Sequence, residues 1–170
     1  MELVFSVNVS RDYDAADERI DDLHREATTH KKTDLNKAIA CLVDAKNLMY
    51  GKDDRMIEQW LRLPLFLQQA GRFDEAMEQF EELLDMVRPR NERRLSFLNN
   101  TTHVELAICS DKMRIYDKMK LACKREKLTD KASFYAGLYD DCLALREELS
   151  VKLKNENAAN FDNALKRLFM

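Results

Sequence analysis

The sequence predicts an all-α fold, and three observations support this prediction. The 170-residue chain contains only three glycines and two prolines, whereas all-β folds need turn residues at short intervals. Hydrophobic residues make up 45% and charged residues 35% of the chain, a balance that favours helices with solvated outer faces. From Asp14 onward, apolar residues recur every three or four positions, which is the period of a helix that is buried on one side.

The first ten residues follow a different pattern. Phe5, Val7 and Val9 alternate with polar residues, which is the period of a half-buried strand. We therefore expect residues 1–10 to form an extended arm or a strand that pairs elsewhere. The apolar run ends at Phe5 and is too short for the core of a signal peptide, and no later run approaches the roughly 20 residues that cross a bilayer. These features favour a cytoplasmic protein without a membrane segment.

Residues 14–89 are expected to form two helix hairpins. A first helix carries Ile20, Leu23 and Ala27 on one face, and a second begins after Thr33 or Asp34 and ends near Gly51. A third helix is expected from Asp53 or Asp54 to Ala70, and a fourth from Phe73 to Pro89, with Gly71 between them. The face of the second helix consists of Leu35, Ala38, Ile39, Leu42, Ala45 and Met49.

Further helix hairpins are expected over residues 91–154. The pattern indicates helices at about 91–109, 115–126 and 129–154. A short amphipathic helix within 158–170 is expected to close the stack, and its apolar residues are Phe161, Ala164, Leu165, Leu168 and Phe169. We expect the whole chain, 1–170, to form a single domain.

Residues 56–89 resemble the tetratricopeptide repeat (TPR). The residues that carry the resemblance are Trp60, Leu63, Leu67, Gly71, Phe73, Ala76, Phe80, Leu83 and Pro89. A weaker copy lies 38 residues upstream, where Leu35 corresponds to Phe73 and Ala38 to Ala76. No copy of the signature follows Pro89. The resemblance implies antiparallel hairpins stacked as a short TPR-like right-handed superhelix.

The resemblance also implies a binding surface. In TPR hairpins the first helix lines the concave face, and here that face corresponds to Leu61, Leu65, Gln68, Gln69 and Arg72. Leu61 and Leu65 stand where family members that clamp a terminal carboxylate have Lys and Asn. The resemblance therefore favours an apolar groove for a helix or an extended segment. Alternatively, Leu61 and Leu65 are covered by the N-terminal arm or by a later helix.

Pro64 departs from the family pattern, because the family usually has a small residue there. A proline inside a helix removes one backbone donor and clashes with the carbonyl group four residues earlier, here that of Trp60. We expect a kink between Leu63 and Phe66.

Basic residues are concentrated in residues 88–127. Arg93 and Arg94 are expected in the first turn of a helix, where positive charge is unfavourable. One interpretation is a solvated basic face. Another is a rim that steers an acidic partner, and a third is a site for nucleic acid or phosphate groups. Nucleic acid is the weaker choice, because the overall pI of about 5.7 is acidic and few aromatic residues interleave with the bases.

The sequence does not support an enzyme. His24 and His30 are six residues apart, so one helix face does not carry both, and no metal site is expected. Cys41, Cys109, Cys123 and Cys142 are widely spaced and fit reduced packing residues better than nucleophiles. No phosphate-binding glycine loop or hydrolase motif occurs, and no cofactor is expected.

The sequence thus predicts a non-catalytic protein-interaction module with a dedicated partner. An adaptor, a chaperone for one client, and an inhibitor or immunity protein all fit this description. The expected contact residues are Leu61, Leu65, Gln68, Gln69, Arg72, Arg93 and Arg94. A nucleic-acid or phospholigand binder that uses residues 88–127 is the alternative.

Overall fold

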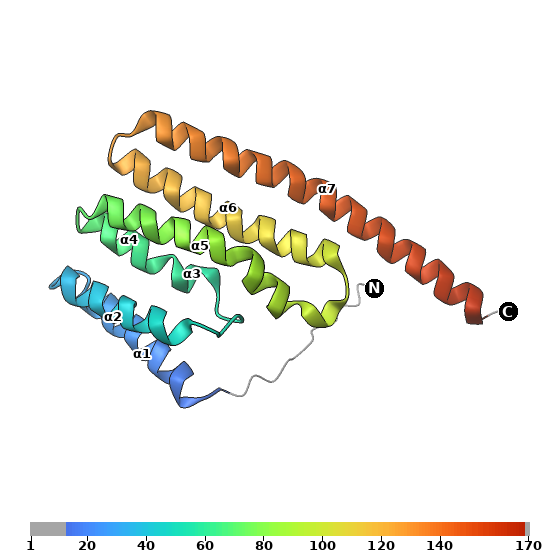
Figure 1. Cartoon of the computed structure of the whole chain (residues 1–170), viewed down its shortest axis with the longest axis horizontal. Coiled ribbons are helices and arrows are strands. Elements are labelled where there is room, and N and C mark those ends of the chain that lie inside the picture. Colours follow the sequence, from blue (N-terminus) through green and yellow to red (C-terminus); the bar gives the residue numbers. More distant parts are fainter. Residues whose placement is uncertain (1–12, 169–170) are drawn as a thin grey trace. The chain divides into compact units, whose positions relative to one another are not determined.

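The computed structural model describes residues 13–168, and the side chains of residues 13–161 within that range. Every regular element in this range is a helix, which confirms the all-α prediction (Figure 1). The expected N-terminal arm, residues 1–10, lies outside the described residues. Backbone contacts divide the chain into two compact units, residues 1–48 and 49–170. Each unit is described separately, and the single domain stays a prediction.

The first unit contains two helices, α1 (Ala15–His30) and α2 (Leu35–Met49). A reciprocal cap starts α1: Asp14 Oδ1 accepts the Asp17 amide at 2.8 Å, and Asp17 Oδ2 accepts the Asp14 amide at 3.2 Å. The predicted apolar faces of both helices are buried, except that Leu35 at the start of α2 is half-buried. The chain leaves α2 through Gly51, whose φ of 80° lies in the left-handed region that favours glycine.

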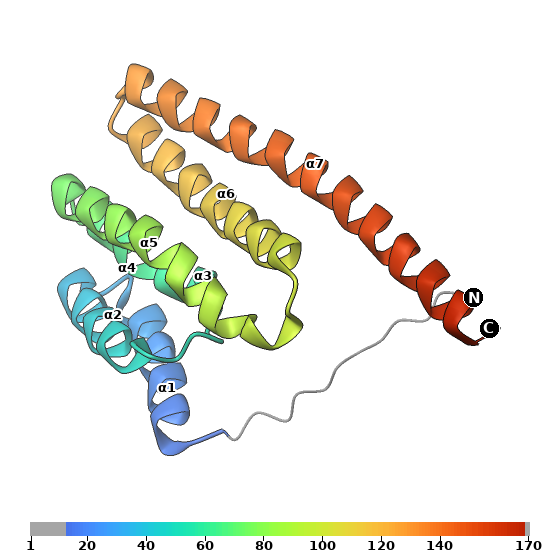
Figure 2. The same cartoon turned by 45° about the vertical axis from the view of Figure 1, so that its right-hand side comes forward.

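The second unit contains the remaining helices. They are α3 (Ile57–Trp60), α4 (Arg62–Gln69), α5 (Phe73–Arg94), the 3₁₀ turn η1 (Ser96–Leu98), α6 (Thr101–Arg125) and α7 (Thr129–Leu168). Helix α4 packs on α5, α5 on α6, and α6 on α7, while α3 and α4 also contact α6. Figures 1 and 2 both show α6 and α7 side by side, with α7 projecting past the end of α6.

Most of the residues that carry the repeat resemblance lie in the core of this unit. Trp60, Ala76, Phe80 and Leu83 are buried, whereas Phe73 is half-buried. Ala76 has no exposed surface, as expected for a small residue where α4 and α5 approach each other.

Helix α5 does not end at Pro89, which corrects the sequence expectation. It continues to Arg94 with the proline inside it. Pro89 is exposed, and so is Asp85, whose carbonyl group loses its helical donor and can be solvated instead. The next residues, Arg90 and Asn91, are buried and hydrogen-bonded, which holds the last turn in helical form.

Two further boundaries differ from the expectation. The predicted helices at 91–109 and 115–126 are one helix, α6, which begins after Asn100; the Asn100 side chain accepts the amides of Thr102 at 2.8 Å and His103 at 3.3 Å. The predicted closing helix within 158–170 is not separate, because α7 runs without interruption to Leu168. Neither glycine nor proline occurs in residues 101–125 or 138–168, so nothing there breaks the helices.

The predicted kink between Leu63 and Phe66 is also displaced. The interruption is at Leu61, which separates α3 from α4. Pro64 has no amide hydrogen to donate to the Trp60 carbonyl, so the irregular turn is on the N-terminal side of the proline.

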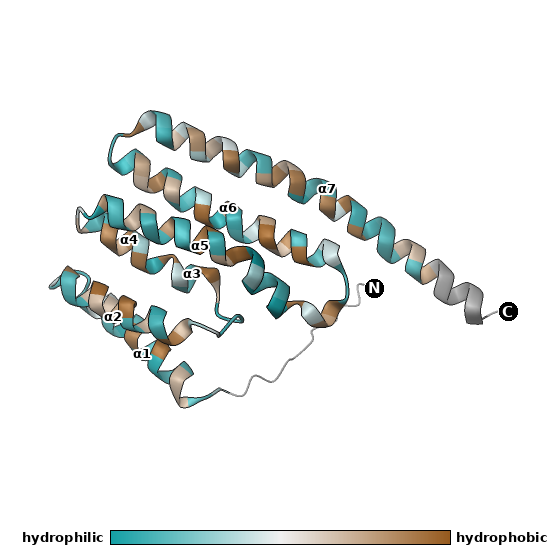
Figure 3. Cartoon of the chain, in the orientation of Figure 1, coloured by the Kyte–Doolittle hydropathy of each residue, from teal (hydrophilic) through white to brown (hydrophobic). Residues whose placement is uncertain are grey.

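Hydrophobic and hydrophilic residues alternate around the helices of the second unit (Figure 3). None of the helices within residues 13–168 is both long enough and hydrophobic enough to span a membrane.

Candidate partner-binding pocket

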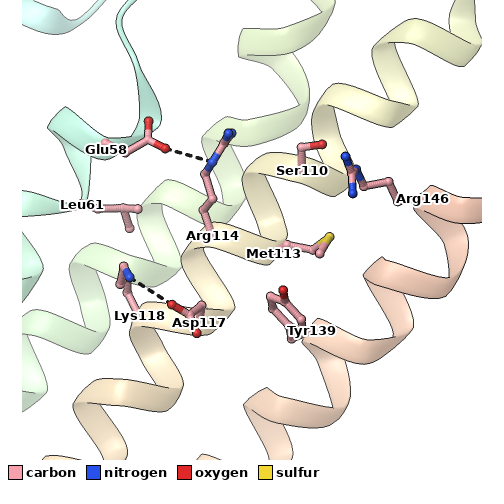
Figure 4. A pocket seen from close by; sticks show the side chains of 9 residues that line it. All are labelled: Glu58, Leu61, Ser110, Met113, Arg114, Asp117, Lys118, Tyr139 and Arg146. Atoms are coloured by element: carbon pink, nitrogen blue, oxygen red, sulfur yellow. Dashed lines mark hydrogen bonds and ion pairs between the residues drawn. The ribbon is translucent and has the colours of Figure 1, made fainter. Parts of the chain in front are cut away.

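A pocket of about 390 Å³ lies within the second unit, where α3, α6 and α7 meet (Figure 4). We call it the α3–α6–α7 pocket. Its lining residues are Glu58, Leu61, Ser110, Met113, Arg114, Asp117, Lys118, Tyr139 and Arg146.

The walls of this pocket are partly apolar. Leu61, at the interruption between α3 and α4, is only 2% exposed, and Met113 of α6 is also nearly buried. Tyr139 of α7 contributes an aromatic ring, which Lys120 covers from 5.2 Å. Because Leu61 and Met113 are nearly covered, the half-buried Tyr139 provides most of the apolar surface that is left for a partner residue.

Ion pairs border the apolar walls. Arg114 Nε lies 2.9 Å from Glu58 Oε1, which links α6 to α3, and Lys118 Nζ lies 3.0 Å from Asp117 Oδ2. Arg146 extends from α7 toward Ser110 and Met113 (Figure 4). Within the described part of the chain, no carboxylate pairs with the exposed Arg146 side chain. This cation is therefore available to an incoming acidic group.

Two of the predicted contact residues are buried by the fold. Leu61 forms part of the pocket wall, and Gln68 is 7% exposed. Gln68 Nε2 donates to Glu126 Oε1 at 2.9 Å, and its Oε1 accepts from Arg125 Nη1 at 3.0 Å. The alternative that the sequence left open, a later helix over Leu61 and Leu65, applies to Leu61, which is buried beside residues of α6, whereas Leu65 is half-buried.

The other residues predicted on this face do not form a continuous surface. Leu65 is half-buried, and Gln69 and Arg72 are exposed. The guanidinium group of Arg72 is engaged by Glu75, with an Nη2–Oε2 distance of 2.5 Å. The α3–α6–α7 pocket includes only Leu61 from the set predicted on the first helix.

Arg93 and Arg94 lie in the last turn of α5 and not in the first turn of a helix, which corrects the prediction. Positive charge is favourable there, because the C-terminal end of a helix carries partial negative charge. Arg93 makes a two-pronged contact with Asp53, at 2.7 and 2.8 Å. Arg94 Nη2 donates to Asn91 Oδ1 at 2.7 Å. The two arginines are adjacent in sequence but have different partners.

Several other bases of residues 88–127 have carboxylate partners. Arg88 contacts Glu105 at 2.7 Å, and Lys120 contacts Asp117 at 3.1 Å. This pairing reduces the field that the basic stretch presents to a polyanion.

Sequence reasoning missed the α7 side of the pocket. Tyr139 and Arg146 are seven residues apart, so a helix places them on one face, and that spacing was the available signal. The signal gives no indication of the neighbouring helices, because the packing of α6 on both α7 and α3 depends on tertiary contacts.

The cysteines have the environment of packing residues. Cys41, Cys109 and Cys123 are buried and Cys142 is half-buried, and all four are free thiols. Burial raises the pKa of each thiol, which reduces the fraction of reactive thiolate. In residues 13–161, no three His, Cys, Asp or Glu side chains are placed to hold a metal ion.

Comparison with known proteins found no protein family, no curated protein and no solved structure that matches this chain.

Proposed function

We propose that the chain is a non-catalytic protein-interaction module that binds a partner segment in the α3–α6–α7 pocket. The observation that carries this proposal is Arg146, an exposed cation beside apolar walls that has no carboxylate partner among the described residues. Apolar contacts with Leu61, Met113 and Tyr139 would bury a side chain of the partner, and Arg146 would pair with an acidic neighbour of that side chain.

The TPR resemblance supports the same proposal. We infer that α4 with α5, and α6 with α7, are successive antiparallel hairpins of a TPR-like stack. The buried positions of Trp60, Ala76 and Phe80 are consistent with that assignment. Helix α5 packs on both α4 and α6, and α4 also contacts α6, which is compatible with that assignment.

A pair of matched charge reversals tests the proposal. Arg146→Glu and Lys154→Glu change the net charge equally, and both residues are exposed on α7, but only Arg146 lines the pocket. Each variant and the wild-type protein are immobilised and exposed to an extract of the source cell, and captured proteins are identified by mass spectrometry. We expect a protein that the wild type and Lys154→Glu retain and Arg146→Glu loses, because the reversal places two acidic groups together.

Equal capture by all three proteins would exclude the pocket as the contact surface. Loss of capture in both variants would point to the overall charge of α7 and would also contradict the proposal. Circular dichroism of each variant establishes that the helices are intact before the comparison is made.

One observation favours the alternative function, a phospholigand binder. Lys120, Lys124 and Lys127 line a second pocket, of about 270 Å³, at the start of α7. Phosphate binding by three lysines would weaken steeply as the salt concentration rises. Binding in the α3–α6–α7 pocket would weaken less, because it combines the one ion pair of Arg146 with apolar contacts. The salt dependence of the captured complex therefore separates the two functions.

A further inference from the structure

Polar residues are buried where the last turns of α5 meet α6. Arg90, Asn91 and Asp111 are 3%, 0% and 5% exposed. Asp111 Oδ2 accepts from Arg90 Nη1 and from Asn91 Nδ2, both at 2.8 Å. Arg90 Nη2 donates to the carbonyl group of Arg55, and Arg94 Nη2 donates to Asn91 Oδ1. A buried charge that is paired in this way is tolerated because its hydrogen-bonding groups have partners.

Two donors of this cluster are exceptions. The Nε atoms of Arg90 and Arg94 are buried, and neither has a hydrogen-bond partner in the described structure. Most buried donors in proteins are paired, since an unpaired one loses its hydration without compensation. Two such donors, on arginines one helical turn apart, leave room for a hydrogen-bond acceptor from outside the chain, either a water molecule or an anion.

Both arginines line the same small pocket, of about 180 Å³. We call it the α5–α6 pocket. Its other lining residues are Asp54, Met56, Ile57, Glu58, Ala107, Ser110, Asp111 and Arg114. The volume suits a single carboxylate or phosphate group better than an extended ligand.

Two of the carboxylates that line this pocket are engaged by other groups. Asp111 accepts from Arg90 and Asn91, and Glu58 pairs with Arg114. Burial lowers the pKa of Arg90, the Asp111 carboxylate partly offsets this, and the nearby charge of Arg94 lowers the pKa again. A bound anion would relieve the repulsion between the two guanidinium groups, because it would lie near both charges.

We propose that the α5–α6 pocket binds an oxyanion, a carboxylate or phosphate group, through the Nε–H groups of Arg90 and Arg94. Arginine suits this task, since its planar guanidinium group presents N–H donors in the geometry of these anions. The pocket shares Glu58, Ser110 and Arg114 with the α3–α6–α7 pocket. As the source of this oxyanion we favour an acidic side chain of the protein partner. Only this choice of source rests on the proposed function.

Nuclear magnetic resonance of the arginine Nε–H groups tests the site directly on the full chain. Sodium acetate and sodium phosphate are titrated separately against sodium chloride at constant ionic strength. We expect the Nε–H signals of Arg90 and Arg94 to shift and saturate with millimolar anion. Saturation by acetate assigns the site to carboxylates, and saturation by phosphate alone assigns it to phosphate groups. No saturable shift with either anion would overturn the proposal.

A matched pair of variants locates the site. Arg94→Gln and Arg93→Gln remove the same charge from adjacent positions, but Arg93 is engaged by Asp53 and does not line the pocket. Arg94→Gln should weaken anion binding by about tenfold or more, because a charged hydrogen bond is lost, and Arg93→Gln should leave it within about twofold. Equal weakening in both variants would show a diffuse charge effect and no site.

The titration of small anions does not depend on a protein partner. If the capture experiment finds no partner but acetate saturates both arginine signals, the proposed function fails and the oxyanion site stands. If a partner is lost with Arg146→Glu but neither anion binds, the proposed function stands and the oxyanion site fails.

Discussion

Asp111 is the residue on which the buried polar contacts between α5 and α6 converge. It accepts from Arg90 and Asn91 at 2.8 Å, and Arg114 Nη1 approaches its other oxygen at 3.4 Å. Its side chain is 7% exposed, so water offers little replacement if the carboxylate is removed. The stability of this part of the fold therefore depends on one acidic group more than on any exposed ion pair.

Asp111→Ala should destabilise the protein by about 3–5 kcal/mol, since it leaves the Arg90 charge buried without its counterion. Asp117→Ala is the matched control on the same helix. Asp117 is 40% exposed and pairs with Lys118 and Lys120, and exposed pairs contribute about 0–1 kcal/mol. Urea unfolding, followed by circular dichroism, measures both changes. Similar losses in the two variants would mean that Arg90 finds another partner or enough water.

Two glycines of the second unit have opposite effects on the helices that they belong to or connect. Gly71, between α4 and α5, has a φ of 75°, which side chains other than glycine rarely adopt. Gly137 lies inside α7, where an added Cβ would meet no atom within 4 Å. The first position therefore requires glycine for its backbone conformation, whereas no packing contact requires glycine at the second.

Gly71→Ala should destabilise the protein by about 1–2 kcal/mol, the cost of the left-handed conformation for an L-residue. Gly137→Ala should stabilise it by about 0.5–1 kcal/mol, since alanine restricts the unfolded chain and favours a helix. Thermal unfolding of the two variants beside the wild type measures both signs. A stabilising Gly71→Ala would contradict the turn described between α4 and α5.

Helix faces were easier to predict than helix ends. The apolar residues of α1, α2 and α5 repeat with a period that fixes the buried side. The structure buries most of those residues, while Leu35 and Phe73 are half-buried. The end of α5 depends on tertiary contacts of Asn91 with Asp111, and the start of α6 depends on the Asn100 cap. Pro89 is a poor guide to the end of α5, because an exposed proline can be accommodated where buried contacts hold the following turn.

For the molecule as a whole, the sequence was sufficient to predict the all-α class but not the α3–α6–α7 pocket. The α3–α6–α7 pocket draws residues from positions 58 to 146, which only the packing of α6 between α3 and α7 brings together. Arg93 and Arg94 illustrate the same limit. No local sequence pattern distinguishes the two arginines. Only the fold places Arg93 beside Asp53 and Arg94 beside Asn91 as hydrogen-bond partners.

The length of α7 has a consequence for its dynamics. Its 40 residues extend about 60 Å, whereas the 25 residues of α6 extend about 38 Å. Among the described side chains, Glu156 of α7 accepts from Thr102 at 3.1 Å, and residues 157–161 are exposed. A helical segment without a packing partner opens at little free-energy cost, because helix propensity alone is marginal in water.

Amide hydrogen exchange should therefore show a gradient along α7. The amides of residues 139–149, which lie in the part of α7 that packs on α6, should exchange slowly, and those of residues 157–161 should exchange orders of magnitude faster. Mass spectrometry of deuterated peptic fragments resolves the two segments. Equal protection in both would mean that a second molecule covers the projecting segment in solution. In either case, the exchange rate at the end of α7 reports on assembly, even while the partner is unidentified.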